Sequence, residues 1–192
     1  MKSMLVLATA CLSVFAFTAR ADAPTLPLYA LKLPLTDQSA VARSLDMHRG
    51  HVVLATMFYG RCPMACPLLI DTIKSIENSL TPAERSRLRV LMVSVDPEHD
   101  TPQALTALAT QRRIDLTRWT LARASREDVR LLAAALDVQY RQLPDGSYNH
   151  TSVITLVQPD GRLAQQTSLL GRADTQFVEA VREALGPMDR AK

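Results

Sequence analysis

The chain has 192 residues, with 22 lysines and arginines against 19 aspartates and glutamates, and a formal net charge of +3. This length suits one domain with an adequate hydrophobic core. The basic residues are scattered and nearly balanced by acidic ones, which argues against a nucleic-acid-binding protein or one that lies on an acidic membrane surface. No internal repeat or low-complexity segment divides the sequence.

Residues 1–23 have the features of a cleavable signal peptide. Lys2 gives a basic start, an apolar stretch runs from Leu5 to Phe17, and Ala21-Asp22-Ala23 places small residues where signal peptidase reads them. The apolar stretch is shorter than the roughly 20 residues that a membrane-spanning helix needs. We therefore expect an exported protein, periplasmic in a Gram-negative host, whose mature form is one domain over 24–192 without an integral membrane anchor.

Strand and helix patterns alternate after an N-terminal lead-in, about 24–34, that we expect to be loose. Two continuous apolar segments, 52–58 and 90–95, are typical of strands buried on both faces. Thr101, followed by a proline, and Ser125 are predicted helix N-caps. The predicted order is strand 52–58, helix 68–80, strand 90–95, a helix from 102, a short strand at 119–121, helix 125–136, an antiparallel hairpin of strands 152–157 and 162–168, and a helix around 177–185. This order predicts an α/β fold of thioredoxin type, in which helices flank a central mixed sheet and a β-hairpin and a helix lie at the C-terminal end.

Cys62 and Cys66 are the only thiols outside the expected signal peptide, which contains Cys11. They fall where a strand gives way to a helix, about one turn apart, so that both sulfurs face the same way. The helix N-terminus and Arg61 favour thiolate over thiol. Such a pair serves as a structural disulfide, a redox couple or a clamp for a soft ion such as Cu(I). We disfavour the structural disulfide because so short a loop adds little stability.

Two sulfurs alone would leave a metal ion under-coordinated, so we expect a third ligand. The histidines are His48, His51, His99 and His150. We interpret the first three as solvent-exposed residues of turns and loops. His150 follows a segment, 144–149, that reads as a flexible loop, and it directly precedes a predicted core strand, from where it can reach the cysteines. The residues alone leave open whether it is a ligand, and they leave Met64 as either a soft auxiliary ligand or a gap-filling side chain.

Three segments occur together: Cys62-Pro63-Met64-Ala65-Cys66-Pro67, then Asp96-Pro97-Glu98-His99-Asp100-Thr101-Pro102, and Asn149-His150-Thr151-Ser152. In this combination, the chain resembles the Sco/SenC copper proteins, exported thioredoxin-fold proteins that handle copper for cytochrome oxidase. The resemblance spans about 33–185. It implies that Cys62, Cys66 and His150 bind one copper ion, as Cu(I), Cu(II) or both. It also implies a chaperone that delivers copper to a respiratory partner, typically the dinuclear copper site of a cytochrome c oxidase subunit.

The chain departs from this family in three respects. Met64 and Asn149 stand where the family usually has acidic residues, and the membrane anchor that the family often keeps is not expected here. The first two departures remove negative charge beside the metal, which bears on the affinity for Cu(II).

A thiol–disulfide oxidoreductase is the main alternative function. In that role, Cys62 attacks, Cys66 resolves, and a periplasmic thiol reductant regenerates the pair. A copper sensor also remains open, whereas the threonine and arginine that support a peroxidatic cysteine are missing. We interpret Asp96, Glu98 and Asp100 as turn and capping residues, with positioning of the copper site or docking of a partner as the alternative.

Overall fold

The computed structural model describes residues 26–62 and 65–187. The expected signal peptide, Cys11, Pro63 and Met64 lie outside these residues. In chain order the elements are η1 (Leu28–Ala30), β1 (Pro34–Asp37), β2 (Ala42–Ser44), β3 (Val52–Phe58), α1 (Ala65–Asn78), α2 (Pro82–Arg87), β4 (Leu88–Ser94), α3 (Pro102–Gln111), β5 (Trp119–Arg123), α4 (Arg126–Ala135), β6 (Tyr140–Gln142), β7 (Tyr148–His150), β8 (Ile154–Val157), β9 (Leu163–Thr167) and α5 (Thr175–Leu185). Within the described residues, no helix combines the length and the hydrophobicity that crossing a membrane requires.

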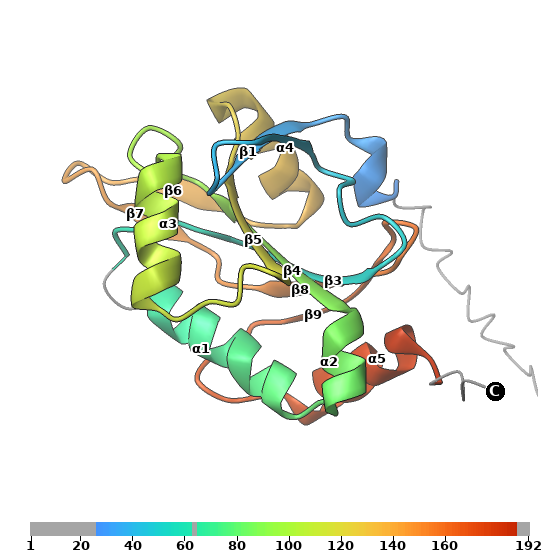
Figure 1. The fold of residues 1–192 in the computed structure, drawn as a ribbon. Coiled ribbons are helices and arrows are strands. Elements are labelled where there is room, and N and C mark those ends of the chain that lie inside the picture. Colours follow the sequence, from blue (N-terminus) through green and yellow to red (C-terminus); the bar gives the residue numbers. More distant parts are fainter. Residues whose placement is uncertain (1–25, 63–64, 188–192) are drawn as a thin grey trace, which may run out of the picture.

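A seven-stranded mixed sheet forms the centre of the fold, in the order β2-β1-β5-β4-β3-β8-β9. The pairs β3–β4 and β4–β5 are parallel, and the other neighbours are antiparallel. All seven residues of β3 are buried, as the continuous apolar run predicts. In Figure 1, α1 and α5 lie on one side of this sheet and α4 lies on the other. The predicted α/β architecture, with its C-terminal hairpin (β8–β9) and helix α5, is confirmed.

Side-chain caps fix the starts of the helices. The hydroxyl of Thr101 accepts a hydrogen bond from the Ala104 N–H, and Ser125 caps α4 in the same way, as predicted. Helix α2 was not predicted from the sequence, although Thr81 and Glu84 form a complete capping box at its start. That spacing of threonine and glutamate, with a proline between them, was a readable helix signal.

The prediction of a loose N-terminal lead-in is wrong. Leu28 and Tyr29 are buried, and the Leu28 N–H donates a hydrogen bond to the Gly161 carbonyl oxygen at 2.7 Å. Gly161 has φ +93°, and a Cβ there would lie 2.6 Å from the Tyr29 ring. Burial of these two large side chains against the β8–β9 turn holds the segment in place. β1 and β2 then extend the sheet beyond β5.

His48 is not a solvent-exposed turn residue either. It is half-buried, and its Nε2 lies 3.2 Å from the Thr120 hydroxyl. Burial, helped by the positive charge of Arg89, lowers the pKa of His48 to about 4. Protonation therefore favours the unfolded chain, whose histidine titrates near pH 6.5.

We expect this histidine to make folding stability depend on pH. The stability should be constant above about pH 6.5 and should fall between about pH 6.5 and pH 4, by about 1 kcal/mol between pH 7 and pH 5. Urea unfolding at the two pH values measures the loss, and His48→Gln should reduce it, leaving the part that comes from His150, whose pKa burial also lowers. An equal loss in that variant would contradict the assignment to His48.

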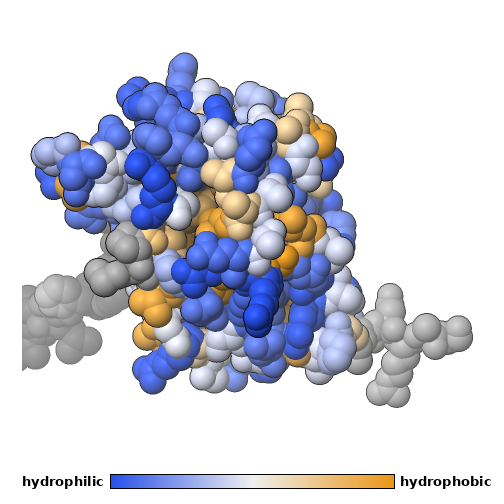
Figure 2. Space-filling view, turned by 60° about the vertical axis from the view of Figure 1, so that its left-hand side comes forward, coloured by the Kyte–Doolittle hydropathy of each residue, from blue (hydrophilic) through white to orange (hydrophobic). Residues whose placement is uncertain are grey.

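The topology brings three separate segments to one edge of the sheet. β3 and β4 are parallel, with Phe58 opposite Ser94, so the segments that follow them emerge side by side. β8 is antiparallel to β3, so the segment before β8 arrives at the same edge, where the Thr56 hydroxyl donates to the Val153 carbonyl oxygen at 2.6 Å. Figure 2 brings forward the side of the molecule that carries α3, β6 and β7, where hydrophobic surface lies in a hollow between hydrophilic side chains.

Candidate metal centre

Cys62, Cys66 and His150 lie together at this edge of the sheet. One donor atom from each residue lies within 4.8 Å of the other two, and the Cys66 Sγ is 3.9 Å from the His150 Nε2. Metal–ligand bonds of about 2.0–2.3 Å put two donors of one ion roughly 3–4 Å apart, so these separations suit a single small ion. Two sulfurs and one imidazole form a soft donor set. Among the described residues, no second group of histidine, cysteine and carboxylate side chains is as close.

His150 lies in strand β7 and not directly before a core strand, which corrects the sequence analysis. The segment read as a flexible loop forms the β6–β7 hairpin, in which Tyr140 is opposite His150. The His150 Nδ1 is 3.1 Å from the Thr151 carbonyl oxygen. Because a carbonyl oxygen only accepts, Nδ1 carries the hydrogen, and Nε2 presents its lone pair to the sulfurs. Burial lowers the pKa of His150, although the bond to Thr151 works the other way, so the ring is neutral at pH 7.

The two cysteines differ in their surroundings. Cys66 lies in the first turn of α1, is 4% exposed, and its Sγ accepts a hydrogen bond from the Tyr59 N–H at 3.5 Å. Cys62 is half-exposed, and its Sγ accepts from the Cys66 N–H at 3.4 Å. The amide at the helix N-terminus thus points at the Cys62 sulfur, as the sequence analysis anticipated.

The expectation that both thiols favour the thiolate form is wrong for Cys66. Burial raises the pKa of the Cys66 thiol, and the hydrogen bond from Tyr59 offsets this only in part. Arg61, which was expected to help, is instead engaged by Asp96, since its Nη2 donates to the Asp96 Oδ2 at 2.9 Å.

This difference predicts unequal reactivity in the reduced, metal-free protein. Cys62 should react with iodoacetamide at least about tenfold faster than Cys66, because Cys66 is buried and its thiol resists ionisation. Mass spectrometry of digests taken at intervals measures the two rates, with urea-unfolded protein as the control. Equal alkylation rates of Cys62 and Cys66 in the folded protein would contradict this prediction.

Asp100 anchors the loop that carries Cys62. This carboxylate is 2% exposed, and its Oδ2 accepts the Gly60 N–H at 2.9 Å and the Ser94 hydroxyl. Burial raises the pKa of Asp100 despite these two bonds. Thr101 caps α3, so the interpretation of Asp100 as a capping residue is wrong. Its bond to Gly60 places it among the residues that position the cysteine loop.

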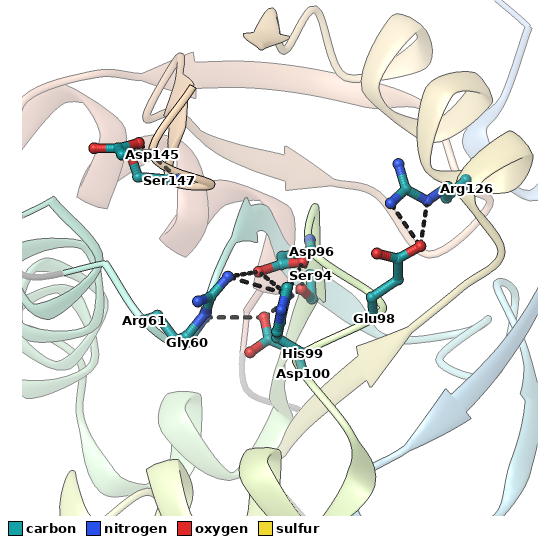
Figure 3. A network of polar contacts seen from close by, with 10 residues as sticks. All are labelled: Gly60, Arg61, Ser94, Asp96, Glu98, His99, Asp100, Arg126, Asp145 and Ser147. Carbon is teal, nitrogen blue, oxygen red and sulfur yellow. Dashed lines mark hydrogen bonds and ion pairs between the residues drawn. The ribbon is translucent and has the colours of Figure 1, made fainter. Parts of the chain in front are cut away.

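A second cluster lies beside Asp100 (Figure 3). Asp96 binds Arg61 and also His99, whose Nδ1 is 2.8 Å from the Asp96 Oδ1. Burial opposes ionisation of Asp96, but its bonds to His99 and Arg61 prevail and lower its pKa. His99 therefore donates a hydrogen bond from Nδ1 to Asp96, whereas Glu98 is exposed and pairs with Arg126.

Three tyrosines lie beside the metal centre and were not predicted from the sequence as part of the site. The Tyr59 ring meets the His150 ring edge-on with centroids 5.8 Å apart, and it lies 5.6 Å from the Tyr148 ring. Tyr140 continues this row at 6.3 Å from Tyr148. Two short polar–aromatic segments around a Pro-Asp-Gly turn were a readable hairpin signal that would have placed Tyr140 and Tyr148 near His150.

Comparison with known proteins identifies the family. The family model SCO1/SenC matches residues 27–186. The SCO1 protein homolog of Bacillus subtilis is 28% identical over 123 residues, which are 62% of this chain and 63% of that protein. The mitochondrial SCO1 homolog of Homo sapiens is 28% identical over 144 residues, 70% of this chain and 46% of the human protein. The chain thus spans less than two thirds of the length of these curated relatives.

Solved structures show the same fold. ScoI of Bradyrhizobium japonicum, solved with copper bound, covers 79% of this chain with 96% of its own, at a TM-score of 0.66 and 23% identity. BsSco, described as a member of the Sco family of cytochrome c oxidase assembly proteins with a disulfide switch, covers 84% of this chain with 95% of its own, at a TM-score of 0.68 and 23% identity. The match of the family model to residues 27–186, together with the predicted and observed fold, shows that this chain belongs to the SCO1/SenC family.

Proposed function

We propose that this protein is an exported copper chaperone. Cys62, Cys66 and His150 bind one copper ion, and a respiratory protein accepts it, typically at the dinuclear copper site of a cytochrome c oxidase subunit. The observation that carries the proposal is the convergence of two sulfurs and one neutral imidazole within 4.8 Å. Family membership and the copper-bound relative support it. Copper is the cargo here, so an open site with few ligands favours its release to a partner.

A copper titration of the reduced protein tests the proposal. Under anaerobic conditions and in competition with a Cu(I) chelator, the wild type should bind one copper ion per chain. The double variant Cys62→Ser/Cys66→Ser should bind none at the same chelator concentration, because hydroxyls are poor ligands for a soft ion. Wild-type protein that binds no more copper than this variant would refute the chaperone.

Thiol–disulfide exchange with the same acceptor is the second candidate function. The Cys62 thiolate attacks a disulfide of the acceptor, one acceptor sulfur leaves as a thiolate, and Cys66 then displaces the second. The products are the Cys62–Cys66 disulfide and a reduced acceptor, and a periplasmic thiol reductant returns two electrons to the pair. The exposure of Cys62 beside the buried Cys66 favours this order of attack.

The proposal also includes the cellular location of the protein and the bounds of its mature domain. We infer export by a signal peptide over residues 1–23 and a periplasmic domain over 24–192. Edman sequencing or mass spectrometry of the protein from a periplasmic extract should give Pro24 as the first residue.

A further inference from the structure

A groove lined by arginines and tyrosines lies beside the metal centre. One part, of about 330 Å³, lies between α4 and the β6–β7 hairpin and includes Arg126, Arg130 and Tyr148. A second part, of about 430 Å³, includes Asn149 and His150. Both parts are lined by Tyr140 and Arg141, so they adjoin along β6. We call this surface the arginine groove.

The groove is cationic. Arg126 and Arg130 are one turn apart on the exposed face of α4, and Arg141 of β6 lines the same part of the groove. No acidic residue lines either part. Glu98 binds Arg126 at 2.6 Å (Figure 3). Within the part of the chain that the structure describes, no ion pair forms with Arg130 or Arg141, so both guanidinium groups remain free to take carboxylates.

The groove is physically continuous with the metal centre. Tyr140 in the groove is the cross-strand partner of His150, and side chains opposite each other on an antiparallel pair share one face. Tyr148 lines the groove and contacts both Tyr59 and Tyr140 through its ring. A chain segment seated in the groove would therefore end next to the imidazole.

We propose that the arginine groove docks an acidic segment of the protein that accepts copper from this chain. The inference rests on the proposed function and adds the chemistry of the partner. Guanidinium groups bind carboxylates through paired hydrogen bonds, and arginine with tyrosine is a combination that protein interfaces favour. Two unpaired arginines, with Arg126 beside them, lie along two adjoining pockets and match several carboxylates along one polypeptide better than one small anion.

A charge-reversal experiment tests the groove. The probe is a fluorescein-labelled ten-residue peptide of alternating glutamate and glycine, and anisotropy at low salt measures its binding. Arg130→Glu/Arg141→Glu should weaken binding at least about tenfold, because two cations become anions. The matched control, Arg162→Glu/Arg172→Glu, makes the same net charge change at two exposed arginines on the β8–β9 side and should change binding less than about twofold. Salt should weaken binding to the wild type more steeply than to the groove variant.

Each outcome decides for or against the groove. The proposal is overturned if the peptide does not bind the wild-type protein, or if both double variants lose equal peptide affinity. It is also overturned if inorganic phosphate or anionic phospholipid vesicles displace the peptide at equal charge concentration. If the glutamate variant does not fold by circular dichroism, Arg130→Gln/Arg141→Gln replaces it with the same expectation. The copper titration of the groove variant is read separately. If the groove variant binds copper as the wild type does but has lost the peptide, the groove is supported. If the wild-type protein binds the peptide but binds no copper, only the chaperone function is refuted.

Discussion

His150→Ala is expected to weaken copper binding at least about 100-fold while the fold stays intact. The ring supplies the only nitrogen donor of the cluster, and its Nε2 already faces the Cys66 sulfur at 3.9 Å with Nδ1 fixed by Thr151. Without it, two sulfurs remain and one coordination position is open to water or chelator. Competition titration with a Cu(I) chelator measures the affinity, and thermal unfolding monitors the fold.

His99→Ala provides the matched control. This histidine lies at the same edge of the sheet but binds Asp96 and is not part of the cysteine cluster. Its removal should change copper affinity less than about tenfold, because losses of about 10–100-fold are typical of residues that hydrogen-bond to a metal ligand, and the partner of His99 is Asp96. Equal copper affinity in wild type and His150→Ala would exclude the three-ligand site.

The same variant separates the two candidate functions. Thiol–disulfide exchange uses only the sulfurs of Cys62 and Cys66, so His150→Ala should reduce an oxidised acceptor within about threefold of the wild-type rate. A chaperone should instead lose copper transfer in proportion to its lost affinity. Measuring both rates on one acceptor domain shows which step depends on the imidazole.

The elements of this fold that could be predicted from the sequence are those whose hydrophobic pattern or helix cap lies within a few neighbouring residues. The apolar runs of β3 and β4 and the caps at Thr101 and Ser125 each depend on a few neighbouring residues, and the structure places all of them as predicted. The order of these elements also predicted a central mixed sheet flanked by helices. The meeting of Cys62, Cys66 and His150 was different, because spacing alone left His150 undecided and the family resemblance supplied it.

What the sequence did not reveal depends on contacts between distant segments. Nothing near Leu28 shows that it will be buried under the β8–β9 turn, because its partner Gly161 is far away in the chain. The role of Asp100 depends on Gly60 and Ser94, which only the parallel pairing of β3 and β4 brings close. The β6–β7 hairpin lacks the hydrophobic alternation by which most strands are recognised, so its only local signal was the Pro-Asp-Gly turn between two tyrosine-containing segments.

Gly60→Ala is expected to destabilise the protein by about 1–3 kcal/mol and to weaken copper binding about tenfold. A Cβ at this position would lie 2.6 Å from the Asp100 Oδ1. The carboxylate cannot turn aside at low cost, because it is 2% exposed and bound to the Ser94 hydroxyl and the Gly60 N–H. The loop that carries Cys62 must therefore move, which displaces one sulfur from the other donors. Urea unfolding and chelator competition measure the two effects.

The double variant Gly60→Ala/Asp100→Ala tests the cause. Asp100→Ala alone should also destabilise the protein, because it leaves the Gly60 N–H without its acceptor. If the clash with the carboxylate is the cause, the two losses of unfolding free energy should sum to more than the loss in the double variant, where the new methyl group meets no oxygen. Strict additivity would mean that the glycine is needed for another reason. Gly60 does not have the positive φ of Gly161, so backbone strain does not explain the need for glycine, and the close approach of Asp100 is the physical reason that we expect the experiment to support.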